Sequence, residues 1–206
     1  VGNAGTGIAE PAGDLGHTSR QTDADAKRAG AAASEPVYFL QTLSFGVDAA
    51  IALNTVDLRK TTGTTGLRLY ARAAASAIIH DLKTHHFEYS IDGKRYTNEL
   101  LICAIQNGKT YGSGFKVAPS ASLSDGLFDV CTAMEVGNTL KALYLLSKMK
   151  GGKHLKYQPP FNFYKAKTLR IKLDAPLPIQ CDGERLRGLD FDISIVPHAL
   201  EVLMGA

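Results

Sequence analysis

Asp182-Gly183-Glu184 is the stretch that decides the fold, because it sets two carboxylates one residue apart at a tight turn between two apolar segments. Glycine readily takes the left-handed backbone conformation that a two-residue hairpin turn needs, so this stretch predicts a β-hairpin with both acids displayed at a strand end. A second acidic turn, Asp125-Gly126, lies upstream and is followed by Asp129. One Asp-Gly pair is only a common hairpin signal, whereas several such motifs in a fixed order are specific.

Length and composition indicate one globular domain with a real core, since the chain has 206 residues of which 45% are hydrophobic. The net charge of +3 is too small for a general nucleic-acid binder, so no nucleic-acid partner is expected. Cys103, Cys131 and Cys181 show no paired metal-binding spacing and are typical of reduced, buried cysteines in a cytoplasmic protein. Neither a membrane-spanning run nor a secretory signal is recognisable, so any membrane association is expected to be peripheral.

Composition divides the chain near residue 36. Residues 1–36 contain 15 Gly or Ala and only three large aliphatic residues, which are too few to offset the entropy lost on ordering. We therefore expect most of this stretch to be a flexible linker. Residues 37–206 are expected to form a β-rich domain.

Hydrophobic periodicity indicates an α+β fold that is mainly β. One amphipathic helix is predicted over residues 67–82 and a second over 140–149, the latter capped by Asn138 and ended by Gly151 and Gly152. Alternating or buried apolar patterns predict strands at 37–43, 87–91, 94–97, 100–105, 128–134, 169–173, 177–181, 191–195 and 199–203. Hairpin turns between strands favour antiparallel sheets packed as a two-layer sandwich with two attached helices.

The order of the motifs resembles the C-terminal lobe of the bacterial diacylglycerol kinase and lipid kinase family, which is related to sphingosine kinases and more distantly to NAD kinases. The resemblance covers roughly residues 37–203. The matching stretches are Ser44–Ala49, Asn107-Gly108, Gly112–Gly114 with Pro119, Asp125–Asp129, Lys150–His154, Asp182–Glu184 and Ile195–Leu203.

The resemblance implies an ATP-dependent kinase that transfers the γ-phosphate to a lipid hydroxyl. Such kinases also have an N-terminal lobe whose Gly-Gly-Asp-Gly-Thr loop holds the nucleotide phosphates, and this sequence contains no such loop. Phosphoryl transfer depends on positioning ATP, metal and acceptor together, so the chain is expected to be a fragment that is inactive without that lobe.

The resemblance assigns catalytic roles to the last acidic turn. It implies that Asp182 is the base that accepts the proton of the lipid hydroxyl. Gly183 and Glu184 are expected nearer the nucleotide, where Glu184 would help Mg²⁺ and the phosphate oxygens to find one geometry. Without the family pattern, an Asp-Gly-Glu turn is more often purely structural.

A structural Mg²⁺ site is also implied, formed by the Asp125 side chain and the Leu123 carbonyl, with Asp129 as a neighbour. Hard cations prefer oxygen ligands, and a turn can present a carboxylate beside a free carbonyl. The alternative is a solvated turn that binds no metal.

Two further groups of residues are candidates for substrate and membrane contact. Asp48 follows a glycine bend near the position of a substrate-recognising aspartate in sphingosine kinases, and Asn107 lies in a turn expected to line the cleft between lobes; capping and turn roles are the alternatives. Lys150, Lys153 and Lys156 belong to a lysine-rich, acid-free stretch with interleaved aromatics, which suits an anionic membrane surface. A solvated loop with aromatics packed on the core is the plainer interpretation.

Other classes of function stay open. The chain could be a non-catalytic lipid-binding or regulatory module, or part of a kinase for a soluble acceptor such as NAD. A deep apolar cavity beside Asp182 would favour a lipid, and a small polar pocket would favour the soluble acceptor. The lipid used and the oligomeric state, including a homodimer, are not fixed by the sequence.

Overall fold

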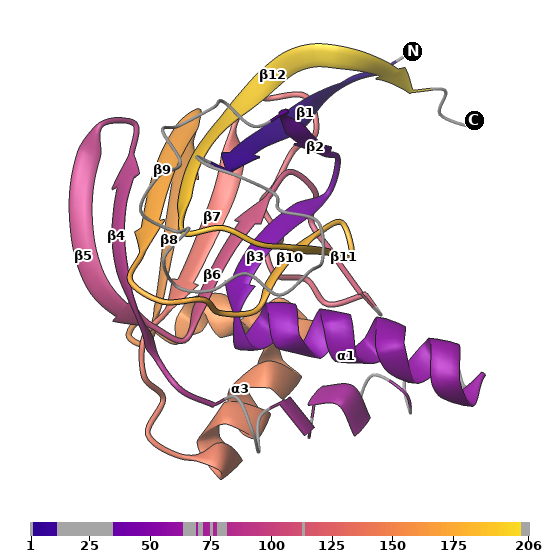
Figure 1. Cartoon of the computed structure of the whole chain (residues 1–206), viewed down its shortest axis with the longest axis vertical. Coiled ribbons are helices and arrows are strands. Elements are labelled where there is room, and N and C mark those ends of the chain that lie inside the picture. The colour runs from indigo at the N-terminus through magenta and orange to yellow at the C-terminus, as the bar shows by residue number, and fades with distance from the viewer. Residues whose placement is uncertain are drawn as a thin grey trace, which may run out of the picture.

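The computed structural model describes residues 2–11, 35–63, 69, 72–74, 76–77, 82–112 and 114–202. Their strands form two six-stranded antiparallel sheets that face each other, with helices on the outer side of the second sheet (Figure 1). The predicted α+β sandwich, mainly β, is thus confirmed.

The first sheet has the strand order β2-β1-β12-β9-β4-β5. Neighbouring strands are antiparallel throughout, and β4 and β5 are joined by an Asp92-Gly93 turn. The bounds are β1 Gly2–Pro11, β2 Val37–Phe39, β4 His85–Ile91, β5 Lys94–Leu100, β9 Thr168–Leu173 and β12 Asp190–Val202.

The second sheet has the order β11-β10-β3-β6-β7-β8 and carries the Asp182 hairpin at its edge. Strands β3, β6 and β7 are buried at every position, because one face meets the first sheet and the other meets the helices. The bounds are β3 Thr42–Gly46, β6 Ile102–Gln106, β7 Phe128–Ala133, β8 Phe161–Ala166, β10 Ile179–Cys181 and β11 Glu184–Leu186.

Aromatic side chains fill the space between the sheets. Phe45 from β3 meets Phe87 from β4 and Phe191 from β12 edge-to-face, at ring-centroid distances of 6.2 and 5.3 Å. All three rings are fully buried. Edge-to-face contact between rings of this size contributes beyond simple area burial, so these pairs help to fix how the sheets face each other.

The helices cover the outer face of the second sheet. They are α1 (Val47–Thr62), α3 (Thr139–Lys150) and the 3₁₀ turn η2 (Lys153–Lys156). Helix α3 begins as predicted, since Asn138 Oδ1 accepts the Lys141 N–H at 2.9 Å. The helix predicted over 67–82 is present at the positions that the structure describes, which are Leu69, 72–74 and 76–77. The rest of 67–81 lies outside the described residues.

Helix α1 was not predicted. The sequence indicated only a glycine bend before Asp48, and the structure places the end of β3 at Gly46 and the start of α1 at Val47 there. The first two turns of α1 are buried almost all round, so they lack the one-sided apolar pattern by which a surface helix is recognised.

The predicted linker is wrong for Gly2–Pro11, which form β1 between β12 and β2. Pairing with β12 runs from Gly2 opposite Val202 to Pro11 opposite Phe191, with one register shift. Because these contacts are made by the backbone, they do not require the large side chains whose scarcity suggested a linker. Residues 12–34 lie outside the described residues.

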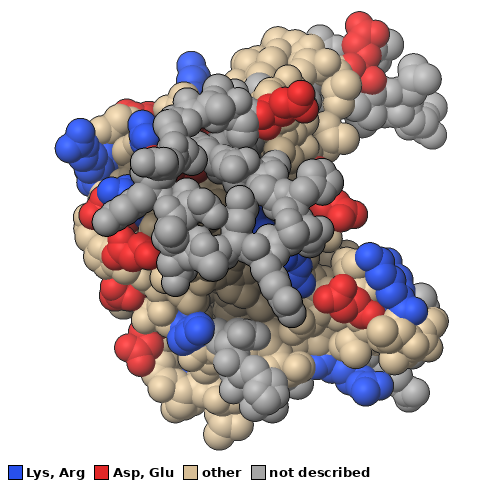
Figure 2. All heavy atoms as spheres, in the orientation of Figure 1, with Lys and Arg blue, Asp and Glu red and all other residues tan. Residues whose placement is uncertain are grey.

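Charged side chains of both signs are interspersed over the face shown in Figure 2. This mixed distribution agrees with the small net charge of +3. Among the described residues, no helix is long and apolar enough to span a bilayer. The three cysteines are buried and unpaired, as expected.

We predict that Gly46→Ala will strongly destabilise the domain. Gly46 has φ +94°, and a Cβ there would lie 2.3 Å from the Leu101 carbonyl oxygen, so both the backbone and β6 would have to move. The loss of unfolding free energy should reach about 3 kcal/mol or more, measured by urea denaturation.

Gly63→Ala is the matched control at the other end of α1. Gly63 has φ +63°, but a Cβ there would meet nothing within 4 Å. Only the cost of the left-handed conformation remains, about 1 to 2 kcal/mol. Equal losses for the two variants would show that the contact with Leu101 is unimportant.

Candidate functional site

The Asp182 turn is a two-residue hairpin loop between β10 and β11. Asp182 has φ +47° and Gly183 has φ +91°, and Cys181 pairs with Glu184 across the turn. Two successive left-handed residues give the turn whose twist matches that of the strands. The predicted hairpin is confirmed, and Asp182 lies exposed at its tip.

The Asp182 carboxylate binds three consecutive backbone N–H groups. Oδ2 accepts from Leu40 at 2.6 Å, and Oδ1 accepts from Gln41 at 3.1 Å and from Thr42 at 2.8 Å. These residues form the corner between β2 and β3. The sequence predicted one strand over 37–43, and the structure breaks it here, because the carboxylate takes the N–H groups that would otherwise continue a ladder.

Asn107 holds the same corner from the other side. Its Nδ2 donates to the Leu40 carbonyl and its backbone N–H to the Gln41 carbonyl, both at 3.0 Å. The Gln41 side chain in turn donates to the Thr110 carbonyl. Asn107 is buried and does not line the adjoining pocket. It therefore positions the corner that Asp182 contacts.

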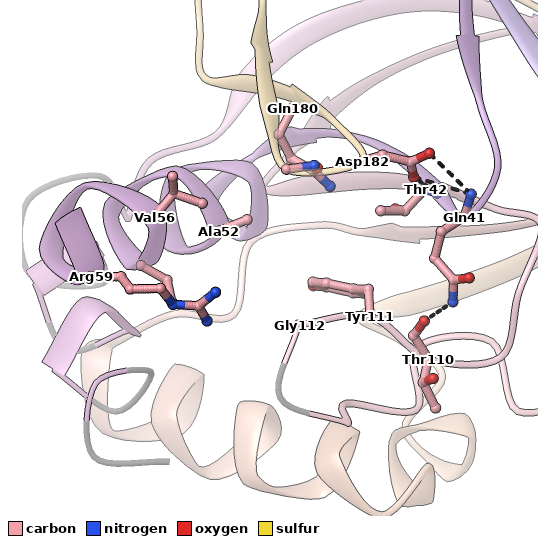
Figure 3. Close-up of a pocket in the computed structure, with 12 residues that line it drawn as sticks. Gln41, Thr42, Ala52, Val56, Arg59, Thr110, Tyr111, Gly112, Gln180 and Asp182 are labelled. Carbon is pink, nitrogen blue, oxygen red and sulfur yellow. Dashed lines mark hydrogen bonds between the residues drawn. The ribbon is translucent and has the colours of Figure 1, made fainter. Parts of the chain in front are cut away.

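A pocket of about 520 Å³ opens beside Asp182. Its walls come from α1, the β3 corner, the 110–112 loop and the Asp182 hairpin. Figure 3 shows Arg59 from α1 and Tyr111 projecting into the space below Asp182. Arg59 and Asp182 thus line one open pocket, and a guanidinium with a carboxylate is a suitable pair for a phosphate beside a hydroxyl.

Sequence reasoning placed some of these residues and missed others. Gly183 lines the pocket, whereas Glu184 is exposed on β11 and does not line it. Arg59 was missed because α1 was missed. Tyr111 was not predicted, although an aromatic residue before a glycine turn was the available signal.

Asp48 lies in a different place, an apolar slot beneath α1. The slot measures about 30 Å³, room for about one water molecule, and is walled by side chains of α1, α3, β6 and β7. Asp48 is 1% exposed. Its Oδ2 accepts from the Tyr111 hydroxyl at 3.3 Å, and its Oδ1 makes no hydrogen bond of ordinary geometry to the described residues.

Burial raises the pKa of Asp48 to about 7, against the opposing effect of Ser44, the Ala49 amide and Tyr111. Near neutral pH the acid is therefore partly protonated, which lowers the cost of keeping it in an apolar slot. Tyr111 lines both the slot and the pocket beside Asp182, so the two spaces adjoin at this side chain.

The Asp125 turn, predicted as a Mg²⁺ site, holds a lysine. Lys165 Nζ lies 2.8 Å from Asp125 Oδ2 and 3.0 Å from Asp129 Oδ2. The other oxygens are also engaged, by the Leu127 N–H and the Ser120 hydroxyl. Leu123 is exposed. No group of three or more His, Cys, Asp or Glu able to hold a metal occurs among the described residues. The Lys165 ammonium lies between the two carboxylates and offsets one of their two negative charges, so Mg²⁺ would have to displace it to bind there.

Lys150, Lys153 and Lys156 lie exposed at the end of α3 and on η2. They are remote from the Asp182 hairpin in sequence and belong to none of the walls of its pocket.

Comparison with known proteins identifies the domain. Residues 41–204 match the family model described as "YegS C-terminal NAD kinase beta sandwich-like domain". The chain belongs to this family. The match covers both sheets except β1, β2 and part of the break before β3.

Relatives of this domain are named as kinases. The chain is 30% identical over 131 residues to a Mycobacterium tuberculosis protein named "Diacylglycerol kinase", covering 63% of this chain and 41% of that protein. It is 29% identical over 177 residues to a Pseudomonas savastanoi protein named "Probable lipid kinase YegS-like", covering 82% and 53%. The chain thus spans about half the length of these relatives.

A solved diacylglycerol kinase from Bacillus anthracis has a similar fold. The TM-score is 0.54 at 15% sequence identity, with 95% of this chain and 51% of that structure covered. At this identity the likeness supports the fold alone.

We predict that Asp48 makes stability depend on pH. Its folded pKa of about 7 exceeds its ordinary value of 3.8, so its contribution to stability is full below pH 3.8 and is lost as the pH rises to about 7. Asp48→Asn should therefore gain stability relative to wild type by roughly 2 to 4 kcal/mol between pH 4 and pH 8, measured by urea denaturation.

Asp57→Asn, on the exposed face of the same helix, is the control and should show a nearly constant difference from wild type. If Asp48→Asn behaved like Asp57→Asn, the carboxyl group would not be buried as described.

We predict that Lys165→Met will lower the free energy of unfolding by about 1 to 2 kcal/mol, because two neighbouring carboxylates lose their shared cation. Lys167→Met, two residues along and exposed, should change the free energy of unfolding by less than about 0.5 kcal/mol.

Thermal denaturation of wild type should be the same in MgCl₂ and in NaCl of equal ionic strength. If Mg²⁺ specifically raised the melting temperature of wild type and Asp125→Asn abolished that effect, the result would support the predicted Mg²⁺ site.

Proposed function

We propose that this chain is the C-terminal domain of an ATP-dependent lipid kinase of the diacylglycerol kinase type, which transfers the γ-phosphate of ATP to a lipid hydroxyl. The single observation that carries the proposal is the position of Asp182, held at the mouth of a pocket that also receives Arg59. The names of the relatives support the reaction class.

Asp182 is proposed to accept the proton of the attacking hydroxyl. A carboxylate offers about four acceptor positions, and three N–H groups occupy most of them while leaving room for a hydroxyl. The same N–H groups fix its orientation and stabilise its negative charge, so little reorganisation is needed as the hydroxyl approaches. In a loose phosphoryl-transfer transition state, such positioning matters more than strong basicity.

Arg59 is proposed to bind a phosphate of the nucleotide or of the product. Its guanidinium projects from the last turn of α1 into the pocket, where paired N–H donors suit phosphate oxygens. Gly183 leaves the hairpin edge without a side chain, since a Cβ there would meet nothing within 4 Å. A nucleotide could therefore approach the turn closely, and Mg²⁺ would supply neutralisation of its phosphate charge.

The apolar slot at Asp48 favours a lipid over a soluble acceptor. Its walls are mostly apolar, and the polar side-chain groups within them are the Asp48 carboxyl group and the Tyr111 hydroxyl that donates to it. In this conformation the slot is too small for an acyl chain, so lipid binding requires α1 and α3 to separate. A hydroxyl or amine near the head of the lipid would then supply the donor that Asp48 Oδ1 lacks.

The proposal includes a second lobe. The sequence has no Gly-Gly-Asp-Gly-Thr stretch, so the nucleotide phosphates are proposed to be held by another part of the protein, and the chain on its own is proposed to be inactive. The complete gene product should phosphorylate a lipid alcohol from a panel of diacylglycerol, sphingoid base and polyprenol, and the chain alone should not. Phosphorylation of NAD in place of every lipid would favour the soluble acceptor.

We predict that Asp182→Asn in the complete gene product will lower kcat by about 100-fold or more, because a neutral amide cannot take up the proton. The variant should also lose about 1 to 3 kcal/mol of stability, since Asp182 uses both carboxylate oxygens. The readouts are steady-state lipid phosphorylation and thermal denaturation.

Asp92→Asn is the matched control. Asp92 also occupies the first position of an Asp-Gly turn, with φ +46°, but uses only Oδ1 to accept the Lys167 and Thr168 N–H groups and lies away from the Asp182 pocket. It should keep turnover within about twofold. A folded Asp182→Asn enzyme with normal turnover would show that Asp182 is only structural.

A further inference from the structure

Helix α3 is apolar on two opposite faces. Its inner face, with Ala142, Leu145 and Met149, is buried in the core. Its outer face exposes Leu140, Leu143 and Tyr144, whose exposed fractions are 80%, 39% and 49%. At 100° per residue, the outer three centre opposite the buried three. We define Leu140, Leu143 and Tyr144 as the α3 outer face.

Lysines border this face on both sides. Lys141 lies along one side and Lys150 along the other, and both are exposed. Lys148 Nζ lies over the Tyr144 ring, 4.5 Å from its centroid. The cations are therefore arranged around the apolar stripe.

The 3₁₀ turn η2 extends the same surface. Leu155 is 36% exposed, and Lys153 and Lys156 beside it are exposed. The Tyr144 and Tyr157 hydroxyls are 2.9 Å apart, which ties η2 to the outer face of α3. The sequence has no acidic residue between Glu135 and Asp174, so nothing in this segment opposes its positive charge.

We propose that the α3 outer face, with the lysines around it, docks on the surface of a bilayer that contains anionic lipids. The outward leucines are suited to enter the acyl boundary, the tyrosine to lie at the interface and the lysines to meet headgroups. The apolar stripe is complementary to the acyl region of such a bilayer, and the lysines along its borders are complementary to the anionic headgroups. The lysines alone suggested peripheral contact from the sequence, and the structure adds the apolar stripe that they surround.

The position of α3 indicates which end of the domain would face the bilayer. In Figure 1 the helix lies at the lower end of the molecule, at the opposite end from β1 and the C-terminal part of β12. Its inner face supplies Ala142, Leu145 and Met149 to the wall of the apolar slot at Asp48. One helix would thus separate the slot from the bilayer. The docking itself does not depend on the kinase reaction.

The test is co-sedimentation of the chain with vesicles of phosphatidylcholine alone or with added phosphatidylglycerol. Wild type should bind the phosphatidylglycerol vesicles and bind the neutral ones far more weakly. The double variant Leu140→Gln/Leu143→Gln should lower the partition coefficient at least about tenfold, because both side chains leave the acyl boundary. Lys141→Gln/Lys150→Gln should lower it to a similar degree, at about fivefold per lysine, and only on the anionic vesicles.

Leu189→Gln and Lys172→Gln are matched controls, since both residues are exposed and lie outside α3 and η2. They should bind as wild type does, and every variant should keep the wild-type melting curve. Failure of wild type to bind anionic vesicles, or equal binding by the leucine variant, would overturn the proposal. So would sedimentation equilibrium that showed a dimer abolished by the leucine substitutions, since the face would then contact a second copy.

Discussion

The contact between the Asp182 carboxylate and the N–H groups of residues 40–42 is the interaction on which the site depends. It joins the edge hairpin of the second sheet to the corner where the chain passes from β2 in the first sheet to β3 in the second. The Asp182 N–H also donates to the Thr42 carbonyl at 2.9 Å. Without this double connection, the pocket would lose the fixed position of two of its walls.

The same turn chemistry serves two purposes in this molecule. At Asp92-Gly93 and at Asp182-Gly183, a left-handed aspartate turns its carboxylate onto backbone N–H groups of a distant segment. The first aspartate only fastens β4 to the β8–β9 connection, whereas the second also faces a pocket with Arg59. Local geometry therefore does not make Asp182 functional; what distinguishes it is the neighbouring α1, which brings the cation.

Local signals explain which parts of the fold could be predicted. Period-two patterns and Asp-Gly turns placed most of the strands, and Asn138 with the glycines at 151 and 152 placed α3, because these signals depend on near neighbours. They missed β8 and β11, and they divided the continuous strand β12 into two. The β1 strand could not be found, because its partner is the backbone of residues about 190 positions away. Nor could α1, whose first turns are buried nearly all round. Arg59 lies on α1 and was therefore not predicted either.

The three acidic sites that the sequence singled out are stabilised in different ways, and this decides what each can do. Asp125 and Asp129 share Lys165, so the protein itself offsets one of their two negative charges. Asp48 has no cation and is buried, so it approaches neutrality by holding its proton. Asp182 is exposed and receives three N–H groups, which stabilise the anion without cancelling its charge. Of the three sites, only Asp182 is exposed and lines the pocket that Arg59 also lines, which is why we propose it, rather than the others, as the proton acceptor.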